Sequence, residues 1–493
     1  AGILSGLVLA CTPVAALVFR YNNPDSLLTL FLVVSAYCLV RGQESARVRW
    51  LVVAAVLIGC AFNTKLLQSY VVLPAVIFAI AVSWPGTVGA RIMALVVSGA
   101  SLVVSSSWWI ALSELAPRSI RPFIDSGGSD SALRLALGTN GIHRVVFGGA
   151  SSDTNQILES TRRFVGEPGP LRLFNEQFAG QASWLLLVAV GALVAGIAAN
   201  KRATRTSPKV FALLLWGGWL LVHVVLFSFM RGTARSYYAI SFAPAIAALV
   251  GYGLTVLSAE GPVWYRRLVL PALSIATGIL AAVISLRTPE FVPWLGTVAA
   301  GGTIGALALG HGEDKSTIRK RWGTALLTMF LLATPALHTL VTVATTYSGG
   351  RVSAGPGFDP TSFPAQGTPA SGIVCLTIPT LSPEATQIIR RSAEEHRWAV
   401  GVCGSRNAAH LELVHQVPVA AFGGYLGKGG PPSVTQLQEL LQNNSVQYFL
   451  FAMNSPQRSD VTEAERWVID RCALTRVEAG DFGLFDCKGV VTH

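Results

Sequence analysis

Long apolar stretches with little charge fill the first 350 residues of the chain. Eleven stretches without Asp, Glu, Lys or Arg follow one another there: 1–19, 26–40, 50–64, 66–90, 92–113, 177–200, 210–230, 236–259, 268–286, 291–312 and 322–350. A helix needs about 20 mostly apolar residues to cross a bilayer, and the two shortest stretches reach that length with flanking residues or tilt. The pattern predicts a polytopic α-helical membrane domain at 1–347 with about eleven crossings. Buried helices of a soluble protein are the alternative, which the number of stretches argues against.

The pattern changes after residues 348–372, which are rich in Gly, Pro, Ser and Thr and indicate a linker. Beyond it, short strand-like runs alternate with helix-like segments. The predicted strands are 373–378, 398–403, 417–422, 446–451 and 482–485, and the predicted helices are 383–396, 408–415, 433–442 and 462–472. Strands alternating with helices predict a small parallel α/β domain over residues 373–493.

Lysine and arginine are spread unevenly over the predicted loops, which predicts the orientation in the membrane. Residues 1–350 carry 26 Lys+Arg and 13 Asp+Glu, so the excess positive charge of the chain lies in its apolar part. Fourteen of these cations fall in one set of alternate loops, and five fall in the short loops of the opposite set. The first set is predicted to be cytoplasmic, and the long loop 114–176 and the α/β domain extracytoplasmic, in a plasma (inner) membrane protein. Topology thus explains the charge, and no nucleic-acid partner is expected.

Four of the seven cysteines lie in the predicted α/β domain, on the side of the membrane where disulfides persist. Four cysteines allow three pairings. We favour Cys375 with Cys403 and Cys472 with Cys487, the first pair because the two strands that carry these cysteines are expected to be neighbours. No cysteine or histidine pattern typical of a soluble metal site is found.

Polar and ionisable groups gather where the predicted spans reach the outer face. Arg20, Asn23 and Asp25 precede the span that starts near residue 26. A carboxylate in a first helical turn interacts favourably with the helix dipole, and that is the structural explanation for Asp25. The functional explanation is a carboxylate at the membrane surface that binds a cation or orients a substrate hydroxyl.

Further cations lie on the same face, where positive charge is otherwise sparse. Lys65 separates two spans with almost no loop, and Gln68 follows it; snorkelling to the surface is the simpler explanation for this lysine. Together with Arg20, the cations Lys65, Arg231 and Arg235 at one membrane level predict an anion site, and a phosphate at that depth suggests a lipid phosphate. The polar residues expected to contribute are Asn175, Glu176, Gln181, Tyr237 and Tyr238.

Several motifs together resemble the family-39-like membrane glycosyltransferases of bacteria, in the YkcA/B-like mannosyltransferase branch. The matching segments are 12–14 with 20–28 (TPV and RYNNPDSLL), 62–68 (FNTKLLQ), 172–178 (RLFNEQF), 181–185 (QASWL) and 421–425 (AFGGY). The likeness runs along nearly the whole chain. In one departure, Arg235 and Ser236 precede Tyr237 and Tyr238, where the family usually reads HPYY, so a metal role for that histidine is not carried over.

The resemblance implies a GT-C fold and a hexosyltransferase. Such an enzyme passes a sugar, with mannose as the first candidate, from a polyprenyl-phosphate donor to a glycan, lipid or protein acceptor on the extracytoplasmic face. The family's catalytic base is an acidic residue on its first outer loop, which is expected to precede residue 1, so we expect the chain to lack an N-terminal segment. Asp25 matches the second acidic position, which in relatives helps to bind a divalent cation or the sugar. A divalent metal ion is therefore a candidate cofactor.

Two other classes of function remain open from the sequence. A transporter or a flippase of lipid-linked glycans is one, although no internal repeat is found and the charges lie at the outer face rather than at mid-membrane. A non-catalytic membrane scaffold, with the α/β domain as a binding module, is the other. An assay with a labelled polyprenyl-phosphate sugar separates all three classes.

Overall fold

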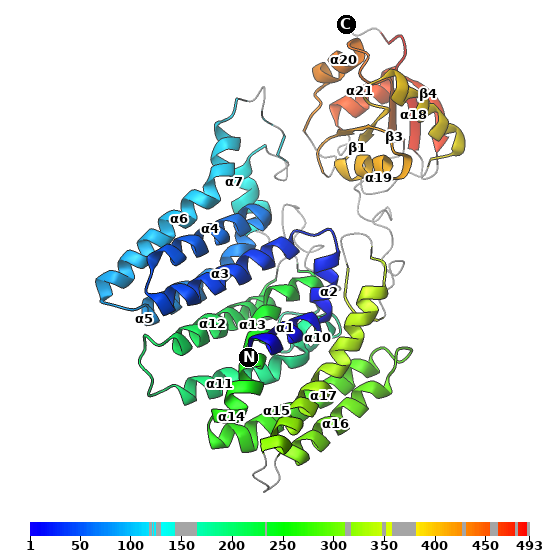
Figure 1. The fold of residues 1–493 in the computed structure, drawn as a ribbon. Helices are drawn as coiled ribbons and strands as arrows, with labels where there is room; N and C mark the ends of the chain where they lie inside the picture. The colour runs from blue at the N-terminus through cyan, green and yellow to red at the C-terminus, as the bar shows by residue number, and fades with distance from the viewer. Residues whose placement is uncertain are drawn as a thin grey trace. The chain divides into compact units, whose positions relative to one another are not determined.

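The computed structural model of the chain describes residues 1–117, 121, 123–124, 130–142, 165–231, 234–310, 317–347, 352–356, 381–425, 430–453, 462–478 and 482–490. The chain divides into two compact units, which are described separately below (Figure 1). The first unit consists of Ala1–Leu112 and Ala136–Pro360. The second consists of Ser113–Leu135 and Thr361–His493.

Helices make up the first unit, which we call the membrane unit. Its main helices are α1 (Gly2–Ala10), α2 (Pro13–Arg20), α3 (Asp25–Ser45), α4 (Val48–Lys65), α5 (Leu73–Ser83), α6 (Val88–Leu115), α10 (Ala179–Ala182), α11 (Leu186–Ala199), α12 (Pro208–Phe229), α13 (Ala243–Tyr252), α14 (Ser258–Glu260), α15 (Leu270–Leu286), α16 (Trp294–Gly310) and α17 (Thr317–Ala344). Shorter helical turns join them: η1 (Leu66–Val72), η2 (Leu135–Ile142), η3 (Arg172–Phe174), η4 (Ser183–Leu185), η5 (Ser236–Ser241), η6 (Gly253–Leu257) and η7 (Tyr265–Val269). The short helix α7 (Ala132–Arg134) belongs to the second unit. Small residues let helices approach closely, and a Cβ at Gly59 of α4 would lie 1.9 Å from the Ser105 hydroxyl of α6.

By length and composition, eight helices of the described residues can cross a membrane, or nine if the bent pair α1 and α2 is one span. The sequence predicted eleven crossings. With the bent pair counted as one span, the remaining difference of two has two sources: Trp294–Leu309 is shorter than the others, and Val48–Ser83 counts as one segment of 36 residues. The polytopic helical fold is confirmed, whereas the number of crossings depends on how this long segment runs.

The segment Val48–Ser83 folds back on itself. Lys65, at the end of α4, contacts Asp25 at the start of α3. Gln43, near the end of α3, donates hydrogen bonds to the carbonyl oxygens of Ser83 at the end of α5 (2.9 Å) and of Thr206 (2.7 Å). The middle and the end of the segment thus meet opposite ends of α3, so α4 and α5 run in opposite directions.

These contacts sort the loops into two ends of the membrane unit. Gln43 joins the loops near residues 41–49 and 201–209. The sequence predicts both loops on the same side of the membrane. The loops that hold Asp25 and Lys65, which it places on the other side, meet through that ion pair. The alternation of loops agrees with the sequence, and the assignment of the second end to the outer face stays a prediction.

A five-stranded sheet with helices on both faces forms the core of the second unit, which we call the α/β unit. Its elements are α18 (Pro383–Glu395), β1 (Val400–Cys403), α19 (Ser405–His415), β2 (Val419–Phe422), α20 (Val434–Gln442), β3 (Tyr448–Ala452), α21 (Glu463–Arg471), β4 (Ala473–Glu478) and β5 (Phe482–Asp486), with strand order β2-β1-β3-β5-β4. Two apolar clusters lie on the two sides of the sheet: one includes Ile389 of α18 and Leu411 of α19, and the other includes Leu437 of α20 and Val468 of α21.

The sheet is mixed, which corrects the prediction of an all-parallel domain. β1 pairs with β2 and β3 in parallel, but β5 pairs antiparallel with β3 and with β4. β4 is not among the strands predicted from the sequence, because its exposed, charge-bearing residues do not alternate as those of a half-buried strand do. Strands joined by a short connection must run antiparallel, and β4 and β5 are such a pair. Their register shifts between Leu474 and Arg476.

Disulfides and a docked loop complete the α/β unit. A disulfide joins Cys472 and Cys487, with Cα atoms 4.6 Å apart, next to the β4–β5 pair. Cys403 is also disulfide-bonded, whereas Cys375 and the predicted strand 373–378 lie outside the described residues. Phe123, from the loop after α6, packs against Gly430, where a Cβ would lie 2.6 Å from its ring.

Candidate active site

Asp25 is fully buried at the first position of α3, with 0% of its surface exposed. The Asn23 side chain accepts a hydrogen bond from the Asp25 backbone N–H (2.8 Å), which fixes the entry into the helix. One carboxylate oxygen of Asp25 accepts a hydrogen bond from Lys65 Nζ, and the other accepts one from Gln68 Nε2 at 3.2 Å. A buried carboxylate requires such partners, because leaving an ionised group unpaired in a low dielectric is costly.

Lys65 reaches Asp25 because α4 ends at that residue. The next residue, Leu66, has φ +49° and ψ −138°, a conformation that a residue with a Cβ rarely adopts. Backbone strain of this kind costs about 1–3 kcal/mol and persists only where surrounding contacts enforce it. The turn directs η1 away from α4 and leaves Lys65 and Gln68 on the same carboxylate.

Two tyrosines surround the Lys65 ammonium. Nζ lies 4.5 Å from the ring centroid of Tyr238 and 5.6 Å from that of Tyr237, and the two rings meet edge to face at 5.1 Å. An ammonium over an aromatic face is attracted by the ring quadrupole. Tyrosines at a membrane interface are commonly explained as part of an aromatic belt. Here both tyrosines contact the Lys65 ammonium instead.

Gln68 links this arrangement to the middle of the membrane unit. Its Nε2 also lies 3.3 Å from the Ser241 hydroxyl, and the Ser241 carbonyl oxygen accepts a hydrogen bond from Trp219 Nε1 at 2.7 Å. Sequence reasoning missed Ser241 and Trp219; the only available signal was the position of Ser241 one turn beyond the tyrosines. We call the set Asp25, Lys65, Gln68, Tyr237, Tyr238 and Ser241 the Lys65 cluster.

The other predicted cations have different surroundings. Arg20 is exposed and donates hydrogen bonds to the carbonyl oxygens of Thr342 (3.3 Å) and Val343 at the end of α17. A cation at the C-terminal end of a helix is favourable, because it interacts with the helix dipole and donates hydrogen bonds to the last free carbonyl groups. Arg231 is exposed beyond α12, and Arg235 is half-buried at the start of η5. Of the four predicted cations, Lys65 is the one that contacts Asp25 in the described residues, and a common anion site formed by all four stays a prediction.

Asn175 and Gln181 were predicted to bind substrate, but their amides make hydrogen bonds within the protein. Asn175 donates to the Val165 carbonyl oxygen (2.8 Å), and its Oδ1 accepts from the backbone N–H groups of residues 177 and 178. Gln181 is 2% exposed and holds residues 353 and 354. Buried amides are normally satisfied in this way, which sequence alone does not distinguish from a binding role. Glu176 is exposed.

Arg172, which lies in one of the resemblance segments, has a structural role that sequence reasoning missed. It is 3% exposed and donates hydrogen bonds to the carbonyl oxygens of Val165, Gly166, Phe227 and Met230. Burial lowers the pKa of its guanidinium. The arginine joins the loop before η3 to the end of α12, which fixes where the segment with Arg231 begins.

The surroundings of Asp25 do not fit a divalent metal ion. Both of its carboxylate oxygens already accept hydrogen bonds, one of them from a positively charged ammonium that would repel a cation. Divalent cations such as Mg²⁺ and Ca²⁺ take several oxygen ligands. Among the described residues, no group of three or more His, Cys, Asp or Glu side chains is placed to hold a metal. No step is therefore assigned to a metal at Asp25.

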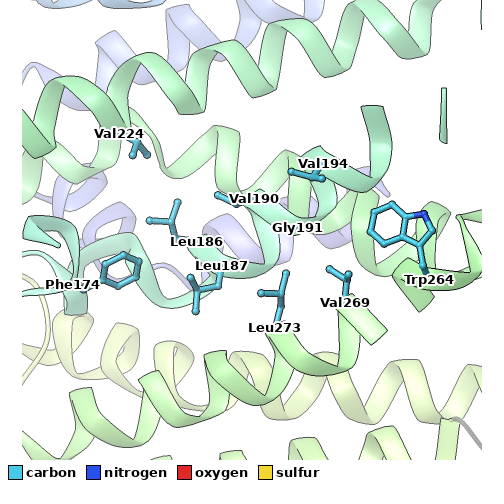
Figure 2. Close-up of a pocket in the computed structure, with 10 residues that line it drawn as sticks. All are labelled: Phe174, Leu186, Leu187, Val190, Gly191, Val194, Val224, Trp264, Val269 and Leu273. Carbon is cyan, nitrogen blue, oxygen red and sulfur yellow. The ribbon is translucent and has the colours of Figure 1, made fainter. Parts of the chain in front are cut away.

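An apolar groove of about 400 Å³ lies elsewhere on the membrane unit. Figure 2 shows it running past α11, with Phe174 toward one end and Trp264 toward the other. Val224 of α12 and Leu273 of α15 also line it. No residue of the Lys65 cluster is part of this lining, so the groove is a feature separate from the cluster.

Comparisons with known proteins agree with the helical membrane fold. Residues 1–110 match the family model described as "Dolichyl-phosphate-mannose-protein mannosyltransferase", and residues 385–471 match "Putative mannosyltransferase YkcB-like, C-terminal". Arg20, Asp25, Lys65 and Gln68 all fall inside the first match, which supports the GT-C fold expected from the resemblance.

Two proteins of Bacillus subtilis (strain 168) are similar over most of the chain. "Putative mannosyltransferase YkcB" is 25% identical over 94% of this chain and 75% of its own length, and "Putative mannosyltransferase YycA" is 28% identical over 93% and 77%. The crystal structure of ArnT from Cupriavidus metallidurans bound to undecaprenyl phosphate aligns with 99% of this chain and 80% of that one, at 16% identity and a TM-score of 0.45. The family models and the two relatives confirm the predicted resemblance to YkcA/B-like mannosyltransferases and the prediction that the chain is a membrane glycosyltransferase.

Proposed function

We propose that the chain transfers a hexose, with mannose as the first candidate, from a polyprenyl-phosphate donor to an acceptor at the extracytoplasmic face. The observation that carries this proposal is the Lys65 ammonium, held by buried Asp25 between two tyrosine rings at one end of the membrane unit. The family matches support the sugar-transfer chemistry. The donor, the sugar and the side of the membrane follow from the resemblance.

The reaction is a single displacement at the anomeric carbon. The acceptor hydroxyl oxygen bonds to that carbon, while the bond from the carbon to the phosphate oxygen breaks and the polyprenyl phosphate leaves with the electron pair. Negative charge grows on the leaving phosphate, and a positioned cation stabilises it. An ammonium has three N–H donors, and Lys65 uses one of them on Asp25, so it is the group that we assign to this phosphate.

Asp25 has a positioning role in this proposal. It is fully buried and both of its oxygens accept hydrogen bonds, so it is poorly placed to take a proton from an acceptor hydroxyl. The carboxylate instead directs the ammonium at one point, and Gln68 holds the second oxygen. The proton of the acceptor passes to a base outside the Lys65 cluster.

The test is a transfer assay with membranes that contain the full chain and radiolabelled polyprenyl-phosphate mannose or glucose. Lys65→Ala is expected to lower transfer on the order of tenfold or more, and Lys65→Arg to retain part of it, because the charge remains. Lys209→Ala is the matched control, since Lys209 is exposed at the start of α12. The adjoining loop meets Gln43 near the end of α3, away from Asp25 at its start. Normal transfer by Lys65→Ala, or no transfer by the wild type from either donor, would reject the proposal.

A further inference from the structure

The residues just beyond the last membrane helix pack back onto the membrane unit. We call residues 352–356 the strap. Val352 is 2% exposed and Ala354 is 8% exposed, and both pack in a small apolar cluster with Leu17 of α2, whose partly buried members include Tyr21 and Tyr237. This burial is unusual for a segment that leads into a linker rich in Gly, Pro and Ser, since such segments normally run over the surface.

Hydrogen bonds fix the strap in place. Gln181 Nε2 donates to Ser353 Oγ (2.9 Å) and to the Ala354 carbonyl oxygen (3.1 Å), and Gln181 Oε1 accepts from the Ala354 N–H (3.0 Å). The Gly355 N–H donates to Thr342 Oγ1 at 2.8 Å. One amide thus makes three bonds to two successive residues, which fixes both the position and the register of the strap.

The strap supports the cluster from behind. Tyr237 contacts the strap through the apolar cluster, meets Tyr238 edge to face, and lies 5.6 Å from Lys65 Nζ. Ser236, next to Tyr237, donates from its hydroxyl to the Val352 carbonyl oxygen at 3.3 Å. A continuous series of contacts therefore runs from Gln181 through the strap and Tyr237 to the ammonium.

We infer that Gln181 is a positioning residue, which seats the strap so that Tyr237 holds Lys65 in place for the reaction. The strap thus supports the active site through Tyr237, although it belongs to the connection toward the α/β unit. This inference rests on the proposed role of Lys65. It reassigns Gln181 from contact with substrate to contact with the protein's own backbone.

The experiment measures the strap and the reaction separately. Hydrogen–deuterium exchange of the peptide that covers the strap, in the full chain in nanodiscs, reports whether the Ala354 N–H is held. Gln181→Leu removes all three hydrogen bonds and is expected to speed this exchange tenfold or more. It is also expected to lower kcat and kcat/KM for sugar transfer by the same factor, about tenfold, because only support of the transition state is lost.

Two further variants keep the inference testable. Ser353→Ala removes one of the three hydrogen bonds and is expected to speed exchange and lower kcat by smaller factors than Gln181→Leu. It serves as the test if Gln181→Leu does not fold. Gln177→Leu, the same substitution four residues away, is the control and is expected to change neither quantity. Faster exchange with unchanged kcat would overturn the inference, as would a strap that exchanges freely in the wild type. Failure of the proposed function shows instead as normal transfer by Lys65→Ala, with the strap still protected.

Discussion

Two buried carboxylates, one in each unit, have opposite surroundings. Asp25 in the membrane unit is 0% exposed and has Lys65 and Gln68 on its two oxygens. Glu465 in the α/β unit is 4% exposed, and one of its oxygens accepts from the Thr462 N–H at 3.2 Å. The other oxygen, Oε1, is buried and has no hydrogen-bond partner among the residues that the structure describes. Burial raises the pKa of Glu465 to about 7.

The different hydrogen-bond partners of the two carboxyl groups indicate which of them has a functional role. A buried carboxylate whose oxygens accept from a lysine and an amide can direct the lysine. A buried carboxyl without a cation beside it favours its protonated form. Thr462 and Glu465 form a capping box at the start of α21, so the second carboxyl serves local structure. Burial alone would have selected both residues as candidates, and the partners separate them.

The largest expected effect comes from separating the Asp25–Lys65 pair. Removing one partner of a buried ion pair costs about 3–5 kcal/mol, because the other charge is left uncompensated. Lys65→Met is therefore expected to lower both transfer and thermal stability. Adding Asp25→Asn is expected to recover much of the stability without recovering transfer, which a double-mutant cycle of unfolding measurements checks. Recovery of transfer in the double variant would show that the lysine acts only through stability.

The second effect concerns Glu465 and pH. Its folded pKa of about 7 lies above the ordinary value of 4.5. Between these values the folded state keeps a proton that the unfolded state has lost, so stability falls as pH rises through this window, by about 3 kcal/mol in all. Glu465→Gln is expected to remove this loss and to stabilise the α/β unit at pH 8 but not at pH 4.

Hydrogen exchange of the β1 and β3 amides in the full chain, at pH 5 and pH 8, measures this difference. Glutamine keeps an oxygen that accepts from the Thr462 N–H, so the cap remains. Glu439→Gln, on the neighbouring helix α20, serves as the control for a charge change alone. Equal pH slopes in the wild type and Glu465→Gln would contradict the description of Glu465 as a buried, protonated carboxyl.

The smallest effect compares two helix caps. Ser433 and Thr462 each start a helix with a capping box, the first on α20 and the second on α21. Loss of a capping side chain costs about 1 kcal/mol. Ser433→Ala and Thr462→Ala are expected to lower the stability of the α/β unit by similar amounts in chemical denaturation. A much larger loss at Thr462 would mean that its hydroxyl also governs the buried carboxyl.

Local pattern predicted much of the fold and part of the site. Span length and alternating loops placed Asp25 and Lys65 at the same end of the membrane unit, and the structure joins them in an ion pair across 40 residues of sequence. Four predicted strands and four predicted helices of the α/β unit match observed elements within a few residues. Such elements follow from the periodicity of apolar residues, which the sequence contains directly.

Contacts between distant segments could not be predicted. Arg20 meets the end of α17 across 322 residues, and Gln181 meets Ser353 across 172 residues. A polar side chain near a membrane surface has the same sequence signature whether it binds a ligand or a distant backbone group. Which of these it does depends on how the helices pack, and that arrangement is set by the whole bundle.

The edge strand β4 affects whether two copies of the protein can associate through their sheets. Among the described strands, β4 lies at the edge, where Leu474 and Val477 are about half exposed. An exposed edge strand invites pairing with a strand of another chain. Arg476 lies between these residues and forms ion pairs with Glu384 and Glu478, beside the irregular register of the strand. A charged side chain and a distorted edge both oppose such pairing. We therefore expect β4 to resist edge-to-edge pairing between crowded copies of the protein.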